Sequence, residues 1–341
     1  MATIRDVAKR ASVAPITVSR VINNSGYISD ETRAKVEAAI HELQYVPNSL
    51  SRSLRFKRTN TISLLLSDIT NPFWTTTARG AEDACSEHNM NVFLCNTDEK
   101  QTKLDNYVDV MLQRQTDGFL LVPASNSRQT IERIREQSVP LVLLDRVVED
   151  IEATVVRSDS LGGSRRLVEY LIGQGHRRIA MLAGVESVST TNMRIEGYRQ
   201  ALAAHDISYD PALIRHGHYS LHDDRNIMLT RELVQEEPTA IYGANNFISF
   251  GILQALHQMG LRTPEDMSVV SFDDLPYNWH PDPFLTVIAQ TPYQLGYRAA
   301  DLLLSFIHGN AATTASTTSE EILPVELIER RSVRRLTPQS S

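Results

Sequence analysis

The sequence predicts a small all-α head followed by a larger α/β body of two doubly wound lobes. Charge, helical periodicity and strand–helix alternation all change near residue 58. Residues 1–58 contain ten Lys and Arg against five Asp and Glu, a net charge of +5. The whole chain has a net charge of −7, so residues 59–341 carry −12. A basic head on an acidic body predicts that a polyanion contacts the head alone.

The composition is that of an ordinary globular protein. With 341 residues, the chain is long enough for two or three domains. Its two cysteines, Cys85 and Cys95, match neither a disulfide framework nor a zinc-ligand spacing, which favours a reducing compartment. The N-terminus has no apolar signal-peptide region, and no apolar run approaches the roughly 18 residues of a membrane span. We therefore expect a cytoplasmic protein with no membrane partner.

Three short helices are predicted in residues 1–47. Thr3 suits the N-cap of a first helix that ends near Ala11. Asp6, three residues later, can complete the capping box and favours the positive end of the helix dipole. After a short turn, Pro15 suits the first turn of a second helix, and Ser29 suits the cap of a third. Two short helices joined by a tight turn and closed by a third form the helix-turn-helix arrangement, which binds DNA.

The second helix is expected to enter the major groove of DNA. Arg20 can form a bidentate pair with guanine, worth ~1–3 kcal/mol of discrimination, and Ile16 can contact a thymine methyl group. Thr17 and Ser19 are better placed as phosphate ligands. The outward residues of this helix are Pro15, Ile16, Thr17, Ser19, Arg20 and Asn23. The alternative is a solvated three-helix bundle with an incidental basic face.

A short basic segment follows the third helix. Leu50 and Leu54 lie four residues apart on a potential helix, which has one apolar stripe and is too short to be stable alone. Arg52 and Arg55 lie beside these leucines. Such a helix can fold against its mate in a dimer and insert Leu54 between base pairs in the minor groove. The alternative is a linker whose leucine packs on the body.

From residue 61 onward, short apolar runs alternate with amphipathic stretches. The predicted strands are Thr61–Leu66, Asn91–Asn96, Gly118–Val122, Leu141–Leu144, Ile179–Ala183, Ala240–Ala244 and Ser268–Phe272. The predicted helices between them include Trp74–Glu87, Leu104–Gln115, Leu161–Gln174 and Phe247–Gln258. Repeated strand–helix units predict parallel sheets covered on both faces, and two series of them predict two lobes with a cleft between them.

Polar and aromatic residues follow several of these strands, where ligands bind to open α/β sheets. Either Phe73 or Trp74 can stack on a sugar ring or a base, or can instead close the core. Asp145 suits a helix cap better than a ligand contact. The predicted ligand contacts are Phe73, Trp74, Arg146, Arg194, Tyr219, Asn245 and Asp273. The two arginines suit an acidic or phosphorylated sugar, unless protein carboxylates pair with them.

Three motifs carry a resemblance to a known family. Ile4–Ala8, Thr17–Asn23 and Tyr45–Asn48 resemble the N-terminal signature of the LacI/GalR family of bacterial transcriptional regulators. The resemblance implies that residues 48–55 form a hinge helix with Leu54 as the minor-groove lever, and that Pro15, Ile16 and Arg20 read bases. The expected DNA-binding residues are Thr3, Pro15, Ile16, Thr17, Ser19, Arg20, Asn23, Asn48, Ser51, Arg52, Leu54 and Arg55.

The resemblance continues through the body and implies the periplasmic-binding-protein type I fold. It implies a head of residues 1–47, a hinge and linker of 48–58, an effector-binding and dimerisation domain of 59–335, and a tail of 336–341. The first lobe would hold about 59–158 and 292–319, and the second about 159–290 and 320–335. All of the predicted ligand contacts except Trp74 align with effector positions of the family. Asn246 stands where relatives often have Asp.

The resemblance also implies how the protein acts. A homodimer would bind an inverted-repeat operator in the bacterial nucleoid, under the control of a sugar-like effector and without a cofactor. A purine effector is the alternative within the family. An uptake protein for sugars would share the two lobes but needs an export signal and leaves the basic head unexplained. An enzyme is disfavoured because the sequence has no phosphate-binding Gly-rich loop, nucleophile elbow or metal-ligand cluster.

We expect Arg330–Pro338 to be a short, polar, disordered tail. It lacks the leucine heptads with which a chain could form a tetramer, so a dimer is predicted.

Overall fold

The computed structural model describes residues 2–46, 58–221, 224–274, 282–309 and 319–336. The chain divides into two compact units, Met1–Thr59 and Asn60–Ser341, and each is described by itself. No helix in the described ranges is both long and apolar enough to span a bilayer.

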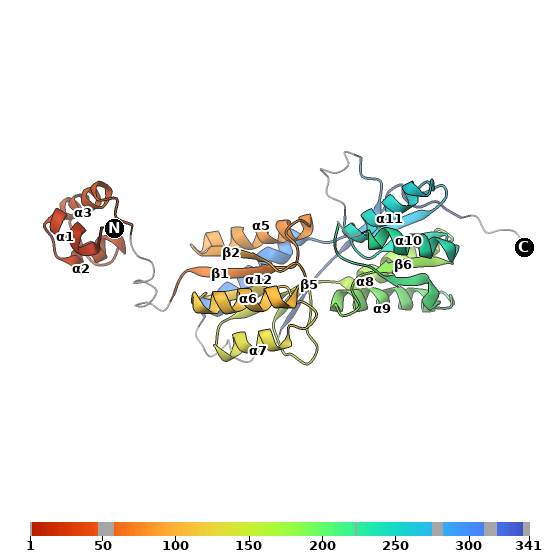
Figure 1. The fold of residues 1–341 in the computed structure, drawn as a ribbon, viewed down its shortest axis with the longest axis horizontal. Helices are drawn as coiled ribbons and strands as arrows, with labels where there is room; N and C mark the ends of the chain where they lie inside the picture. Colours follow the sequence, from red (N-terminus) through yellow and green to blue (C-terminus); the bar gives the residue numbers. More distant parts are fainter. Residues whose placement is uncertain (1, 47–57, 222–223, 275–281, 310–318, 337–341) are drawn as a thin grey trace, which may run out of the picture. The chain divides into compact units, whose positions relative to one another are not determined.

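The N-terminal unit is a three-helix bundle made of α1 (Ile4–Ala11), α2 (Pro15–Ile22) and α3 (Asp30–Glu42), drawn in red in Figure 1. Its core contains Val7, Val18 and Val36, one from each helix, and all three are fully buried. Three local signals set the helix bounds: the Thr3–Asp6 capping box, Pro15 at the first turn of α2, and the Ser29 cap of α3. The predicted helix-turn-helix arrangement is therefore present.

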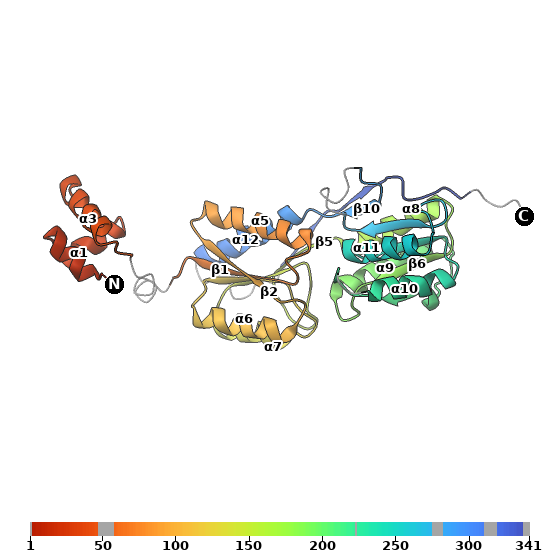
Figure 2. The ribbon, with the colours of Figure 1, turned by 45° about the horizontal axis from the view of Figure 1, so that its top comes forward.

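The first lobe of the larger unit is a six-stranded parallel sheet in the order β11-β5-β4-β3-β1-β2. Helices α5 and α12 cover one face and α6 and α7 the other (Figure 2). The strands are β1 (Thr61–Leu66), β2 (Asn91–Asn96), β3 (Gly118–Leu121), β4 (Leu141–Leu144), β5 (Val155–Ser158) and β11 (Glu320–Leu323). The helices are α5 (Pro72–Glu87), α6 (Gln101–Gln113), α7 (Arg128–Glu136) and α12 (Pro292–His308).

The second lobe has a sheet in the order β12-β10-β9-β8-β6-β7, in which only β12 is antiparallel to its neighbour. Helices α8 and α9 cover one face, and α10 and α11 cover the other (Figure 1). The strands are β6 (Ile179–Ala183), β7 (Ile214–His216), β8 (Ala240–Gly243), β9 (Ser268–Phe272), β10 (Thr286–Ala289) and β12 (Glu326–Ile328). The helices are α8 (Ser160–Gly173), α9 (Ser189–Ala204), the short η1 (Pro211–Leu213), α10 (Arg225–Gln235) and α11 (Asn246–Gln258).

One predicted lobe boundary is wrong. Residues from 320 onward were expected in the second lobe, but Glu320–Leu323 pairs in parallel with Val155–Ser158 in the sheet of the first. Leu323 is buried in the core of the first lobe, and this burial holds β11 there. The third crossing between the lobes therefore follows Leu323.

The prediction of a disordered tail from Arg330 onward is also wrong as far as Leu336, the last described residue. The Ser332 hydroxyl accepts a hydrogen bond from the Thr286 amide and donates one to the Val269 carbonyl. The Leu336 amide donates to the Gln174 carbonyl at 2.8 Å. The polar composition of this segment misled the prediction because backbone hydrogen bonds to the second lobe hold it in place.

Candidate ligand-binding cleft and DNA-reading helix

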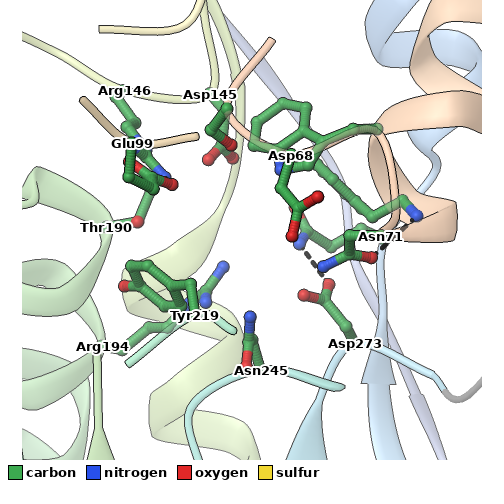
Figure 3. Close-up of a pocket in the computed structure, with 14 residues that line it drawn as sticks. Asp68, Asn71, Glu99, Asp145, Arg146, Thr190, Arg194, Tyr219, Asn245 and Asp273 are labelled. Atoms are coloured by element: carbon green, nitrogen blue, oxygen red, sulfur yellow. Dashed lines mark hydrogen bonds and ion pairs between the residues drawn. The ribbon is translucent and has the colours of Figure 1, made fainter. Parts of the chain in front are cut away.

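A cleft that is partly open to solvent lies between the two lobes of the larger unit (Figure 3). All seven predicted ligand contacts line it. The first lobe contributes Ser67, Asp68, Asn71, Phe73, Trp74, Glu99, Asp145 and Arg146. The second contributes Thr190, Arg194, Tyr219, Asn245, Asp273 and Gln290.

Half of these residues stand just after the carboxyl end of a strand. Asp68 follows β1, Asp145 and Arg146 follow β4, Asn245 follows β8, and Asp273 follows β9. Parallel strands bring their carboxyl ends to one edge of each sheet, and the two edges face each other across the cleft. Asp145 and Asp273 have φ angles of 64° and 70°, in the left-handed region, which short polar side chains tolerate.

Arg146 forms a bidentate ion pair with Glu99 inside the cleft. Its Nη1 and Nη2 donate to the two carboxylate oxygens at 2.7 and 2.6 Å, and Nη1 also donates to the Pro123 carbonyl at 3.0 Å. The guanidinium carbon lies 5.7 Å from the ring centroid of Tyr219, which belongs to the opposite lobe. Burial raises the pKa of Glu99, but the charge of Arg146 and its hydrogen bonds are the main opposing effects, and the net pKa lies below its usual value. Glu99 therefore stays ionised.

Arg194 is the second buried cation of the cleft. Its Nη1 donates to the Ala244 carbonyl at 2.6 Å, and its guanidinium carbon lies 3.8 Å over the ring centroid of Phe272. Burial raises the pKa of Asp145, and raises that of Asp273 to about 6, against the opposing charge of Arg194. Both carboxylates are therefore poorly solvated acceptors that gain from a hydroxyl donor.

The remaining predicted contacts play mixed roles. The Tyr219 hydroxyl lies 2.5 Å from the Thr191 hydroxyl, and Asn245 caps α11 by accepting from the Ile248 amide at 2.8 Å. Phe73 and Trp74 pack edge to face at 4.8 Å between ring centroids. Trp74 is buried in the core of the first lobe, while Phe73 is partly exposed at the cleft. Trp74 therefore takes the core role considered for this pair, and stacking of Phe73 on a ligand stays a prediction.

Sequence reasoning did not identify several lining residues as ligand contacts. Glu99 stands three residues beyond the end of β2, and Gln290 directly follows β10, a strand that was not predicted. The strand-end rule would have found Gln290 only if β10 had been predicted. Gln290 donates to Asp273, and its Oε1 is buried without a hydrogen-bond partner among the described residues. A buried acceptor of this kind is available to a ligand.

An amide pair joins the two lobes beside the cleft. Asn71 Nδ2 donates to Asn246 Oδ1 at 3.1 Å, and Asn246 Nδ2 donates to Asn71 Oδ1 at 2.9 Å. Asn71 caps α5 in the first lobe, and Asn246 begins α11 in the second. Both side chains are buried, so the pair is a direct and well-satisfied link between the lobes.

In the N-terminal unit, α2 presents Pro15, Ile16 and Arg20 to solvent, and Ile16 is 51% exposed. Asn23 is half-buried, and its Nδ2 donates to the Ser19 carbonyl at 2.8 Å. The Thr3 hydroxyl is bonded within the Thr3–Asp6 capping box. Thr17 and Ser19 are half-buried. Five predicted DNA contacts lie outside the described residues: Asn48, Ser51, Arg52, Leu54 and Arg55.

Two family models match the chain. Residues 3–48 match "Bacterial regulatory proteins, lacI family", and residues 59–330 match "Periplasmic binding proteins and sugar binding domain of LacI family". The ribose operon repressor of Escherichia coli (strain K12) is 34% identical over 335 residues, which cover 97% of this chain and 100% of that protein.

Solved structures agree with the family models. The Lac repressor dimer bound to operator and the anti-inducer ONPF aligns with a TM-score of 0.84 at 27% identity, covering 98% of this chain and 99% of that one. A LacI family regulator from Enterococcus faecium with bound ribose aligns with a TM-score of 0.72 at 30% identity, covering 81% of this chain and 100% of that one.

A helix-turn-helix unit followed by a two-lobed ligand-binding domain defines a ligand-controlled, DNA-binding transcriptional regulator. This chain belongs to the LacI family of bacterial regulatory proteins.

Proposed function

We propose that this protein is a homodimeric repressor whose affinity for an inverted-repeat operator is controlled by a neutral sugar in the interlobe cleft. The observation that carries the effector class is the array of buried hydroxyl acceptors around the cleft. Asp145 and Asp273 offer poorly solvated carboxylates, and Gln290 offers a carbonyl oxygen that no described residue hydrogen-bonds. The partly exposed Phe73 offers an aromatic face. Such a mixture of acceptors and an aromatic face suits a compact polyhydroxylated ligand.

An acidic or phosphorylated sugar is less well supported. That expectation rested on Arg146 and Arg194, yet Glu99 already pairs with Arg146. Arg194 faces two carboxylates and stacks on Phe272. The similarity to a ribose operon repressor and to a ribose-bound regulator supports a neutral pentose as the first candidate.

Two further features support a dimer that acts on DNA. The solved Lac repressor is a dimer on its operator. In this chain, the edge strand β2 exposes Phe93 and Leu94, and the adjacent α6 exposes Val110. An apolar sheet edge of this kind is suited to a second copy of the chain. We place the protein in the cytoplasm, on the nucleoid, and assign it no catalytic step.

The test has two arms. Genomic footprinting would give the operator, and calorimetry with D-ribose and other neutral aldoses would test the effector class. Addition of the bound aldose is expected to change operator affinity ~5–150-fold, the range of typical coupling free energies. Tight binding of a neutral purine base, without binding of any aldose, would favour the purine alternative. Turnover of the bound ligand would establish an enzyme.

Replacing Arg20 by alanine is expected to weaken operator binding and to relax specificity at one base position. Arg20 is exposed on α2, and a bidentate contact to guanine is worth ~1–3 kcal/mol. The measurement is binding to the operator and to its single-base variants at constant salt. An equal loss of affinity on every sequence would instead make Arg20 a phosphate contact.

Aldose affinity is expected to rise between about pH 5 and pH 7, by at most ~10-fold per pH unit. Burial raises the pKa of Asp273 to about 6; Arg194 and Gln290 favour its charged form, while Asp145 and Asp274 oppose it. A hydroxyl donor from the ligand favours the carboxylate, so binding lowers this pKa and releases a proton at acidic pH. Calorimetry in buffers of different ionisation enthalpy measures the release. In Asp273→Asn, the part of the pH dependence of aldose affinity that comes from Asp273 should disappear. A wild-type affinity that falls as pH rises would refute the role of the Asp273 carboxylate as a hydroxyl acceptor.

A further inference from the structure

Among the described residues that line the cleft, negatively charged groups outnumber positively charged ones. Four carboxylates line it, from Asp68, Glu99, Asp145 and Asp273, against the two guanidinium groups described above. An anionic ligand would therefore meet a net negative lining, unless one guanidinium were available to pair with it. Because interactions between charges are strong at low effective dielectric, this net charge has a large effect on which ligands can bind.

The Glu99–Arg146 pair already supplies the geometry that an anionic ligand would need. Both terminal nitrogens of Arg146 are bonded to Glu99, and the arginine side chain is only 6% exposed. A bidentate fork is also how arginine holds a ligand carboxylate or phosphate. Glu99 thus occupies the place that a ligand anion would take.

The backbone holds Glu99 in this place. Asp98 and Glu99 have φ angles of 51° and 57°, two consecutive left-handed residues just beyond β2. Asp98 is anchored by Asn96 at 2.6 Å and by an ion pair to Lys103. Left-handed residues other than glycine carry a conformational cost, which the surrounding structure must offset. The turn therefore presents the Glu99 carboxylate to Arg146 as a fixed feature of the cleft.

We propose that Glu99 is a specificity-determining residue: by neutralising Arg146, it makes the cleft accept neutral sugars and exclude their carboxylated and phosphorylated counterparts. The inference rests on the proposed function, because it concerns the ligand of the same cleft. Removing the Glu99 charge leaves a buried guanidinium without its partner, a strongly unfavourable state that an incoming anion relieves.

The experiment compares the wild-type protein with Glu99→Gln, which keeps the side-chain shape and removes the charge. Glu132→Gln is the matched control, because Glu132 pairs with Arg128 at the surface of α7. Calorimetry measures the affinities for two pairs of probes, D-ribose with D-ribose 5-phosphate and D-galactose with D-galacturonate. The wild type and Glu132→Gln are expected to prefer the neutral member of each pair. Glu99→Gln is expected to shift the acid-to-neutral affinity ratio by at least ~10-fold toward the acid, a typical value for one charge-assisted pair.

The outcomes separate this inference from the proposed function. If Glu99→Gln keeps its affinity for the neutral sugar and gains none for the acid, the role of Glu99 is refuted while the sugar effector stands. If no neutral aldose binds to the wild type, the proposed effector class fails, and the inference fails with it. Wild-type preference for the acid overturns the inference even if Glu99→Gln does not fold. Glu99→Asp keeps the charge and should still exclude the acid, so acceptance of the acid by this variant also contradicts the inference.

Discussion

Replacing Gly296 by alanine is expected to destabilise the first lobe by roughly 3 kcal/mol or more. Gly296 lies on α12 where this helix crosses α5, and an added Cβ would stand 1.8 Å from the Thr77 carbonyl oxygen. Gly80 makes the reciprocal approach from α5, 2.0 Å from the Tyr293 carbonyl oxygen. Because both obstacles are backbone atoms, the helices must move apart, and the buried contacts between them are lost.

The matched control is Gly173→Ala at the end of α8, where no atom of the described residues lies within 4 Å of the added Cβ. This variant should be neutral or more stable by up to ~1 kcal/mol, because alanine is the better helix former. Urea denaturation measures both free energies of unfolding. The Gly296 variant should also bind the effector more weakly, because α5 carries Asn71, Phe73 and Trp74 at its N-terminus. A Gly296→Ala protein as stable as the wild type would show that the helix contact is not tight.

Much of this architecture follows from local patterns in the sequence. Thr61–Leu66 and Ile179–Ala183 were predicted with the bounds that the structure gives, because continuous apolar runs are typical of strands buried on both faces. Helix α9 was not predicted. Its buried face includes Thr190, Thr191 and Arg194. These polar residues lie at or near the cleft and interrupt the helical spacing of apolar residues from which a helix is predicted.

The cleft was partly predictable for a related reason. Asn245 and Asp273 follow predicted strands directly, so the rule that ligands bind at strand ends locates them. Glu99 was not predicted as a cleft residue because it lies on a left-handed turn beyond the strand. No local sequence pattern indicates that it pairs with Arg146, 47 residues away. β11 was placed in the wrong lobe because its sheet partner, β5, precedes it by more than 150 residues and was itself not predicted.

Replacing Asn246 by alanine is expected to weaken aldose affinity about 5- to 30-fold, the factor that 1–2 kcal/mol of cleft closure represents. The variant loses both hydrogen bonds to Asn71 and leaves a buried amide without them. Residues of both lobes line the cleft, so only the closed arrangement presents the complete set of contacts. The free energy that holds the lobes together therefore enters the effector affinity directly.

A double-mutant cycle isolates the contribution of this pair. Asn71→Ala and Asn246→Ala, alone and combined, should show a coupling free energy of about 0.5–3 kcal/mol in aldose affinity. Asn246→Asp is the informative intermediate: its carboxylate still accepts from Asn71 Nδ2 but cannot donate to Asn71 Oδ1, so its affinity should lie between those of wild type and Asn246→Ala. Additive single-variant effects would mean that the two amides stabilise their own helices, α5 and α11, and contribute nothing to closure.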